Sequence, residues 1–190
     1  MKRSLHRLSL ISIAFLLIGL GACKDPFPRQ KGYLRIDLKK SEYVDFTQCA
    51  FESKISSNAI LKEIPNKDCW FKLTYPDLKA DVHFSYVKIN NNFADLVNSV
   101  HEIKDRHNQV ASYIPEEAIV NKDGSANGIQ FKIQGKRAAS PLNFYLTDSV
   151  NHFVTASLYF NHSPNNDSIQ PIIEHIFEDI DTLVYNWKWD

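Results

Sequence analysis

The chain has 190 residues and equal numbers of basic and acidic side chains, 22 each, so its formal net charge is zero. Lysine and arginine form no cluster along the sequence, which argues against nucleic-acid binding because phosphate backbones attract a basic surface. The length predicts one folded domain with a hydrophobic core of its own.

Residues 1–22 have the composition of a bacterial signal peptide. Lys2, Arg3 and Arg7 give a positive start, and an apolar run follows from Leu8 to Leu20. This run is short for a hydrocarbon core of about 30 Å, which needs about 20 residues of helix. It fits the apolar region of a signal peptide that is cleaved from the mature chain.

The end of this segment, Leu20-Gly21-Ala22-Cys23, resembles the lipobox of bacterial lipoproteins. In that motif small residues precede a cysteine that is free to accept diacylglycerol. We expect cleavage after residue 22 and acyl chains, such as palmitate, on Cys23. Attachment to the membrane then depends on these chains, and several chains make it stable. The alternatives are an ordinary secretory signal with a chance cysteine, or an uncleaved anchor.

The mature chain would carry 19 basic and 22 acidic residues, because Lys2, Arg3 and Arg7 are removed, and its net charge would be −3. Residues 24–31 contain two prolines and four charges, so we expect residues 23–31 to be an extended, lipid-anchored tether. Residues 32–190 would then form a single domain.

Two cysteines remain after lipidation. Cys49 and Cys69 are 20 residues apart, and this spacing does not fit the close pairs of a zinc site. The oxidising cell envelope favours a disulfide, which would contribute about 3 kcal/mol by closing the intervening loop. Two buried free thiols are the alternative.

After the tether, short segments rich in aromatic and β-branched residues lie between turn signals and predict strands. They are Tyr33–Leu38, Ala50–Ile55, Ala59–Ile64, Cys69–Tyr75, Asp81–Ile89, Ile129–Ile133, Leu142–Thr147 and His152–Phe160. Between the last two, residues 148–151 predict a turn because aspartate and asparagine hydrogen-bond to nearby backbone groups.

Two amphipathic helices are also expected. Apolar residues at helical spacing predict a helix over residues 93–107, with Asn90–Asn92 as capping residues. The same spacing over residues 169–187 predicts a second helix, with Ser168 as N-cap and Pro171 in the first turn. The pattern predicts a single α+β domain in which amphipathic helices flank a mainly antiparallel sheet. This order of strands and helices resembles the α/β/α sandwich of the Mog1/PsbP-like fold.

Catalytic and metal-binding patterns are weak. His101 and His107 are six residues apart, whereas the helix of a zinc protease needs histidines four apart. Asp148, Ser149 and His152 lie in one tight turn, which does not suit a linear triad, and no G-x-S-x-G motif is present. We therefore expect no enzymatic activity, no metal and no cofactor. The alternative is an envelope lipoprotein that binds a small ligand or acts as a hydrolase through these three residues.

A series of longer stretches covers nearly the whole mature chain in order. They are Gly32–Leu38, Cys49 with a following aromatic residue, Cys69–Pro76, Lys79–Ala80, Ser85–Tyr86, Phe144–Phe153, Ser157–Phe160, Pro164–Asn165, Asp167–Ser168 and Trp187–Lys188. Together they resemble the gliding-motility lipoprotein GldD family of Bacteroidetes. Two departures are Ala50, where the family suggests proline, and Lys136–Arg137, where it suggests a neutral residue.

The resemblance implies a non-catalytic component of the cell envelope that is required for surface gliding and linked to type IX secretion of surface adhesins. Its partners would be other envelope proteins of these machineries, and its location would be the outer membrane, facing the periplasm. The candidate surface for contact with a partner is the turn with Thr147, Asp148, Ser149 and His152. This turn matches the family pattern more closely than the formation of a hairpin requires. The alternative is that this turn matches for packing alone.

Overall fold

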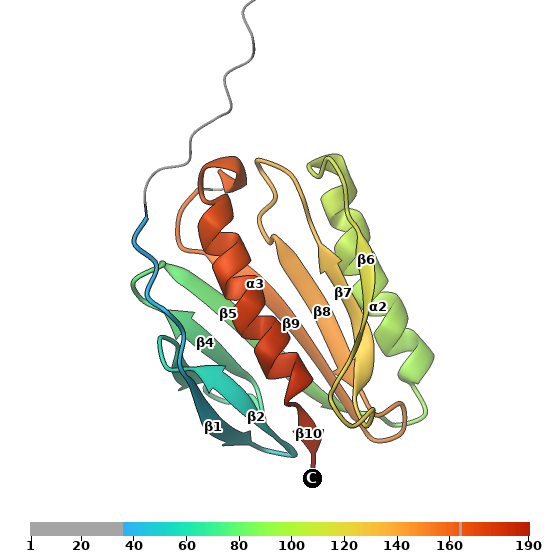
Figure 1. Cartoon of the computed structure of the whole chain (residues 1–190). Helices are drawn as coiled ribbons and strands as arrows, with labels where there is room; N and C mark the ends of the chain where they lie inside the picture. The colour runs from blue at the N-terminus through green and yellow to red at the C-terminus, as the bar shows by residue number, and fades with distance from the viewer. Residues whose placement is uncertain (1–35, 164) are drawn as a thin grey trace, which may run out of the picture. The chain divides into compact units, whose positions relative to one another are not determined.

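A seven-stranded antiparallel sheet lies at the centre of the computed structural model, which describes residues 36–163 and 165–190 (Figure 1). From one edge to the other its strands are β3 (Ile60–Glu63), β4 (Phe71–Tyr75), β5 (Ala80–Lys88), β9 (His152–Phe160), β8 (Leu142–Thr147), β7 (Asn127–Lys132) and β6 (Glu116–Val120). All neighbouring strands run antiparallel. The longest pairing joins β5 to β9 over nine residues.

A three-stranded sheet and one helix cover one face of this large sheet. The small sheet consists of β1 (Tyr43–Gln48), β2 (Phe51–Ser56) and β10 (Lys188–Trp189), with β2 in the middle. Helix α3 (Gln170–Tyr185) packs beside β2, and helix α2 (Phe93–Arg106) covers the opposite face of the large sheet (Figure 1). Single-turn helices η1 (His107–Gln109) and η2 (Asn166–Ser168) follow α2 and precede α3. The described residues therefore form three layers.

Side chains that alternate along the central strands supply two hydrophobic cores. On β8, Phe144 and Leu146 join the core beneath α3, whereas Tyr145 joins the smaller core beneath α2. Because both faces of β8 are covered, all six of its residues are buried. The core beneath α3 also contains Phe51 of β2, whose ring stacks on Trp187 with 4.0 Å between centroids.

The predicted α+β class is confirmed, and both predicted helices are present. Strands β1, β6 and β10 were not predicted. Strands β1 and β6 each bury only one side chain, Phe46 and Ile119, so neither has a clear alternation of apolar residues. Strand β10 has two residues. The predicted strand Tyr33–Leu38 is wrong over Ile36–Leu38, which pair with no strand, and residues 33–35 lie outside the described part.

Both helices begin differently from expectation. Asn92 does precede α2, but its side chain accepts a hydrogen bond from the backbone N–H of Asn90 (2.8 Å) and caps no helical N–H. Helix α3 follows Ile169 as N-cap, so the prediction of Ser168 as the cap is wrong, and Ser168 lies in η2. Pro171 lies in the first turn of α3 as predicted.

The predicted signal peptide (residues 1–22), the lipidation site Cys23 and the tether lie outside the described residues. Within the described part, which belongs to one compact unit, no helix is both long enough and apolar enough to cross a membrane.

The described chain enters the domain at one end of β5. Ile36 and Lys39 lie beside the β4–β5 turn, where the Lys39 ammonium pairs with Asp77 at 2.6 Å. The other end of β5, Lys88, pairs with His152 at the start of β9. Nine extended residues of β5 span about 26 Å at roughly 3.3 Å per residue, so the β8–β9 turn is remote from the point of entry.

Candidate functional site

The β8–β9 turn is held closed by one carboxylate. Oδ1 of Asp148 accepts hydrogen bonds from the backbone N–H groups of Val150 (3.0 Å), Asn151 (2.8 Å) and His152 (2.8 Å). Partial burial raises the pKa of Asp148, but these three donors outweigh it and hold the pKa below its ordinary value. Asp148 is therefore committed to the turn as an anion at neutral pH.

Thr147 and Ser149 complete the turn in different ways. The buried hydroxyl of Thr147 donates to the backbone carbonyl of His152 (2.7 Å) and accepts from the backbone N–H of Ser149 (2.8 Å). Ser149 has φ of 66°, in the left-handed region, and its side chain is exposed. Val150 at the tip is 67% exposed. The turn thus presents Ser149, Val150 and Asn151 to solvent.

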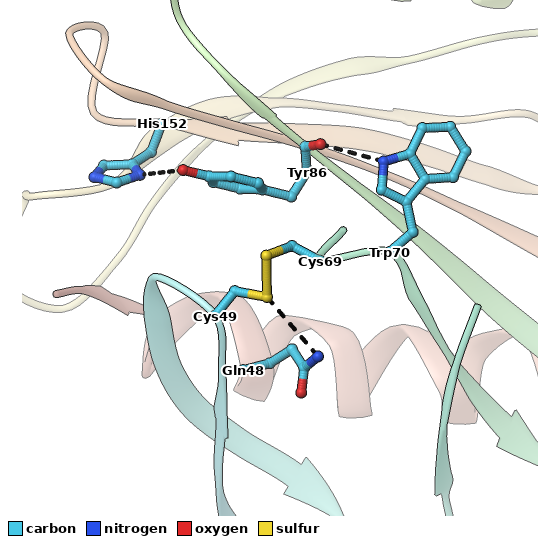
Figure 2. The surroundings of a disulfide bond; sticks show 6 residues. All are labelled: Gln48, Cys49, Cys69, Trp70, Tyr86 and His152. Atoms are coloured by element: carbon cyan, nitrogen blue, oxygen red, sulfur yellow. Dashed lines mark hydrogen bonds between the residues drawn. A yellow bond between two sulfur atoms is a disulfide. The ribbon is translucent and has the colours of Figure 1, made fainter. Parts of the chain in front are cut away.

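His152 connects the turn to a group of half-buried aromatic side chains. Its Nδ1 lies 2.9 Å from the hydroxyl of Tyr86, and its ring stacks on Trp189 with 5.0 Å between centroids. The indole N–H of Trp70 donates to the backbone carbonyl of Tyr86 (3.2 Å), so Trp70 and His152 lie at the two ends of Tyr86 (Figure 2). Partial burial raises the pKa of Tyr86, as does the negative charge of Asp148, which keeps the hydroxyl protonated.

The predicted disulfide between Cys49 and Cys69 is confirmed and lies next to Tyr86 (Figure 2). Cys49 follows β1 and Cys69 precedes β4, so the bond joins the small sheet to the large one, with 5.7 Å between the two Cα atoms. Both residues have left-handed backbones, with φ of 52° and 60°, a conformation that costs a residue with a Cβ about 1 kcal/mol. The disulfide therefore fixes two otherwise unfavourable turns.

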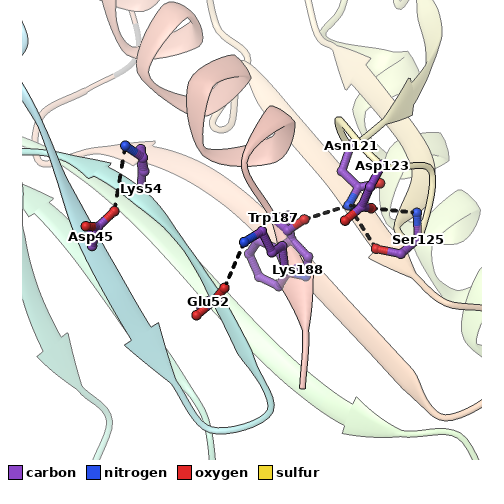
Figure 3. A network of polar contacts seen from close by, with 8 residues as sticks. All are labelled: Asp45, Glu52, Lys54, Asn121, Asp123, Ser125, Trp187 and Lys188. Atoms are coloured by element: carbon purple, nitrogen blue, oxygen red, sulfur yellow. Dashed lines mark hydrogen bonds and ion pairs between the residues drawn. The ribbon is translucent and has the colours of Figure 1, made fainter.

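The last residues of the chain complete this end of the domain. The buried side chain of Asn121 donates to the carbonyl oxygen of Trp187 (2.6 Å), which ties the β6–β7 turn to the segment before β10 (Figure 3). The Lys188 ammonium pairs with Glu52 at 3.1 Å, and the backbone N–H of Asp190 donates to Ala50 (3.0 Å). These contacts hold Trp189 against His152.

We call this region the turn end: the exposed residues Ser149–Asn151 together with the side chains of Trp70, Tyr86, His152 and Trp189. Of the predicted contact residues, Ser149 and His152 lie at its surface, whereas Thr147 and Asp148 are used within the turn. Sequence reasoning did not single out Trp70, Tyr86 or Trp189 as site residues. The first two do lie within stretches that carry the family resemblance.

The geometry of the turn does not bring a nucleophile to a base. Among the described residues no hydrogen bond joins Ser149 to His152, whose Nδ1 faces Tyr86 instead. The carboxylate of Asp148 contacts backbone amides and not the imidazole. In the described part of the chain, no three His, Cys, Asp or Glu side chains are arranged to hold a metal ion.

These features define the described residues as a three-layer α+β domain with a disulfide, and a lipobox-like segment precedes them in the sequence. Comparison with protein families gives a match to the model described as gliding motility lipoprotein GldD over residues 23–189. The chain therefore belongs to the gliding motility lipoprotein GldD family, as the sequence resemblance predicts. Membership of a lipoprotein family implies attachment to a membrane of the cell envelope.

A comparison with curated proteins finds no match. Among solved structures the chain is similar to the solution structure of cyanobacterial PsbP (CyanoP) from Synechocystis sp. PCC 6803. The two chains are 8% identical, with a TM-score of 0.47, over 83% of this chain and 98% of the other. The α+β class itself rests on the strands and layers of this domain.

Proposed function

We propose that this lipoprotein is a non-catalytic component of the gliding machinery that acts by binding another envelope protein through its turn end. It is anchored by acyl chains on Cys23 in the outer membrane, faces the periplasm, and is linked to type IX secretion of adhesins. Family membership supports the role in gliding. The arrangement of side chains at the turn end supports the proposed binding of another protein.

The observation that carries this proposal is the convergence of separate sequence stretches at the turn end. Residues that share the family pattern form a chain of contacts there: Cys49 bonds to Cys69, the neighbouring Trp70 donates to Tyr86, and Tyr86 contacts His152. A hairpin turn by itself requires only a residue such as Asp148 that accepts hydrogen bonds from the backbone; it does not require the other residues of this group. Half-buried tryptophan, tyrosine and histidine side chains beside an exposed apolar tip suit a protein contact, because aromatic anchors dominate such interfaces.

The position of the turn end fits a contact with a partner. It lies about 26 Å along β5 from the place where the chain enters the domain, on the strand rise of roughly 3.3 Å per residue. The turn end is therefore free for contact with a partner that does not bind the end at which the described chain enters the domain. Because Thr147 and Asp148 are used within the turn, the contact residues are Ser149, Val150, Asn151 and His152.

The test replaces Val150 by aspartate in the full-length gene. Val150 is 67% exposed, so Val150→Asp should change the free energy of unfolding by less than about 0.5 kcal/mol, yet it places a charge at the tip. We expect loss of colony spreading with a normal amount of folded protein. The matched control is Val44→Asp on β1, where the valine is 48% exposed and remote in sequence from the turn; this strain should spread normally.

Two results would contradict the proposal. If a clean deletion left both colony spreading and secretion of type IX cargo normal, the proposed role in gliding would be wrong. If the Val150→Asp strain contained folded protein and spread normally, only the proposed contact at the turn end would be wrong. Hydrolysis of an ester or amide substrate by the purified full chain, abolished by Ser149→Ala, would instead favour the hydrolase alternative.

A further inference from the structure

The large sheet ends in an open edge at β6 (Figure 1). Its bonds to the neighbouring strand use alternate residues: Lys132 donates to the carbonyl of Pro115 (3.2 Å), and Asn121 donates to that of Ala126 (2.9 Å). In this register the backbone groups of Glu117 and Ile119 also face β7. The N–H and C=O groups of the alternate residues therefore point away from the sheet.

The outward groups belong to Glu116, Ala118 and Val120. In the described part of the chain no backbone group pairs with them. Edges in soluble proteins are usually protected by a bulge, a covering element, a proline or charged side chains. Here Glu116 and Glu117 are charged, and the end of α3 covers the next outward N–H, that of Lys122, through the carbonyl of Tyr185. The proline at this edge, Pro115, occupies a position that faces β7, so its missing N–H does not interrupt the outward row. This edge is therefore competent to pair with a further strand.

Exposed apolar side chains gather along the same edge. Of nine large hydrophobic residues exposed in the described part, three lie on it or beside it: Tyr113, Val120 and Tyr185. Tyr113 extends the edge by a bridge to Gln134, and the carbonyl of Tyr185 accepts a hydrogen bond from the backbone N–H of Lys122, two residues beyond β6. Tyr113 is 63% exposed and Val120 is 57% exposed. A strand added along this edge would cover Tyr113 at one end and Val120 at the other.

Four acidic side chains flank the edge, two of them paired with lysine, and the exposed Lys122 follows β6. Glu116 lies on the α2 side, paired with Lys104 at 2.9 Å. On the α3 side lie Glu117, Glu178 and Asp181, and the neighbouring base, Lys132, is already paired with Glu117 at 2.7 Å. Burial raises the pKa of Asp181, and the charges of Glu117 and Glu178 act in the same direction while Lys132 opposes them.

We propose that the β6 edge binds an extended, basic segment of another protein, which pairs with Glu116, Ala118 and Val120 as an additional strand. Main-chain hydrogen bonds would supply the affinity, and lysine or arginine side chains would meet the acidic flanks. A second copy of this chain is a poorer occupant, because its own edge carries Glu116 and Glu117 and the same flank on α3. None of the three pairing residues belongs to the turn end, although Val120 directly precedes Asn121, which binds the carbonyl of Trp187.

The decisive variant is Ala118→Pro. Proline at this position removes one outward N–H and no bond to β7, and edge strands tolerate such a proline. The matched control is Ala118→Ser, which keeps the N–H. The double variant Glu178→Gln/Asp181→Asn tests the acidic flank. Thermal unfolding of each full-length protein in detergent micelles establishes that the fold is retained.

The probe is a fluorescein-labelled peptide of about nine residues that repeats Lys-Val-Thr, long enough to span an average strand. We expect it to bind the full chain in detergent micelles and to slow amide hydrogen exchange over residues 112–120. Ala118→Pro should weaken binding by about tenfold or more, because it deletes a central main-chain bond. Ala118→Ser should bind as the parent does, the double variant should bind more weakly, and a Glu-Val-Thr peptide should not bind.

Equal binding by Ala118→Pro and Ala118→Ser would overturn the proposal, as would equal binding of the acidic peptide. So would the absence of any protection over residues 112–120 at millimolar peptide. Concentration-dependent dimerisation that Ala118→Pro abolishes would assign the edge to a second copy and would also overturn it. None of these results depends on colony spreading, so the test stands apart from that of the turn end.

Discussion

Asp148 holds the β8–β9 turn through one carboxylate oxygen, and this role could be predicted only in part. The residue type and its place before Ser149-Val150-Asn151 predict a turn stabilised by a side chain. The sequence does not show that Oδ1 serves three amides, nor that Asn151 contributes its carbonyl to Ile89 (2.8 Å). His152 could not be interpreted from sequence alone, because its partners Tyr86 and Trp189 are distant along the chain.

The first prediction concerns Asp148. Asp148→Ala should lower the free energy of unfolding by about 2 kcal/mol, because three backbone donors lose their acceptor. Asp148→Asn, which keeps an oxygen acceptor without the charge, should lose less. Chemical denaturation of each protein measures the difference. Equal stability of Asp148→Ala and the parent would mean that water replaces the carboxylate without cost.

The same residue predicts a dependence of stability on pH. Because the folded pKa of Asp148 is lowered, its contribution is complete above the ordinary aspartate pKa and is lost as the pH falls through the folded pKa. The difference in unfolding free energy between the parent and Asp148→Asn should therefore shrink on acidification. A difference that stays constant at acidic pH would contradict the shift.

At the scale of the elements, prediction succeeded where side chains bury in a regular pattern. Helix α3 and the central strands β8 and β9 were predicted because their apolar residues recur with the helical or strand period. Strands β1 and β6 were missed because each buries only one side chain and so lacks a clear alternation of apolar residues. Gly128 lies just outside the predicted strand Ile129–Ile133 but inside β7, opposite Leu146. That position reflects close packing of two backbones, which has no signal in a single sequence.

Gly128 provides a prediction at this scale. A Cβ at this position would lie against the carbonyl group of Tyr145, 2.8 Å from its carbon atom, and both are backbone atoms. Gly128→Ala should therefore cost about 3 kcal/mol or more, because β7 and β8 must separate. The control is Gly124→Ala, whose added Cβ meets no atom but whose φ of 77° costs about 1 kcal/mol. Thermal unfolding separates the two; equal losses would contradict the close approach.

At the scale of the whole molecule, two connections at the turn end join the small sheet to the large one. The disulfide links the β1–β2 turn to the start of β4, and Trp187 packs on Phe51 while Asn121 binds its carbonyl. The cysteine pairing was predictable from compartment and number. The role of the C-terminal residues was not, because β10 is too short to have a pattern and depends on β2 for its pairing.

The disulfide predicts the response of the molecule to reduction. Cys49→Ser/Cys69→Ser should lower the free energy of unfolding by about 3 kcal/mol, the value for a loop of this length. Tryptophan fluorescence should change as well, because Trp70 follows Cys69 directly. The parent protein in a dithiol reductant should unfold like the double variant. An unchanged unfolding temperature in reductant would show that the two sheets hold together without the bond.

The position of Asp190 affects where a tag can be attached to this protein. Asp190 donates its backbone N–H to Ala50, one residue from Cys49, and Trp189 stacks on His152. An epitope or fluorescent protein fused after Asp190 would therefore sit against the surface proposed to meet a partner, and a failed complementation with such a fusion would report the tag. The exposed residues Asn108 and Gln109 follow α2, which starts just after the end of β5 near His152 and leads away from it. An internal tag placed there would leave the turn end open, although it would lie close to Ser112 and Tyr113 at the start of the β6 edge.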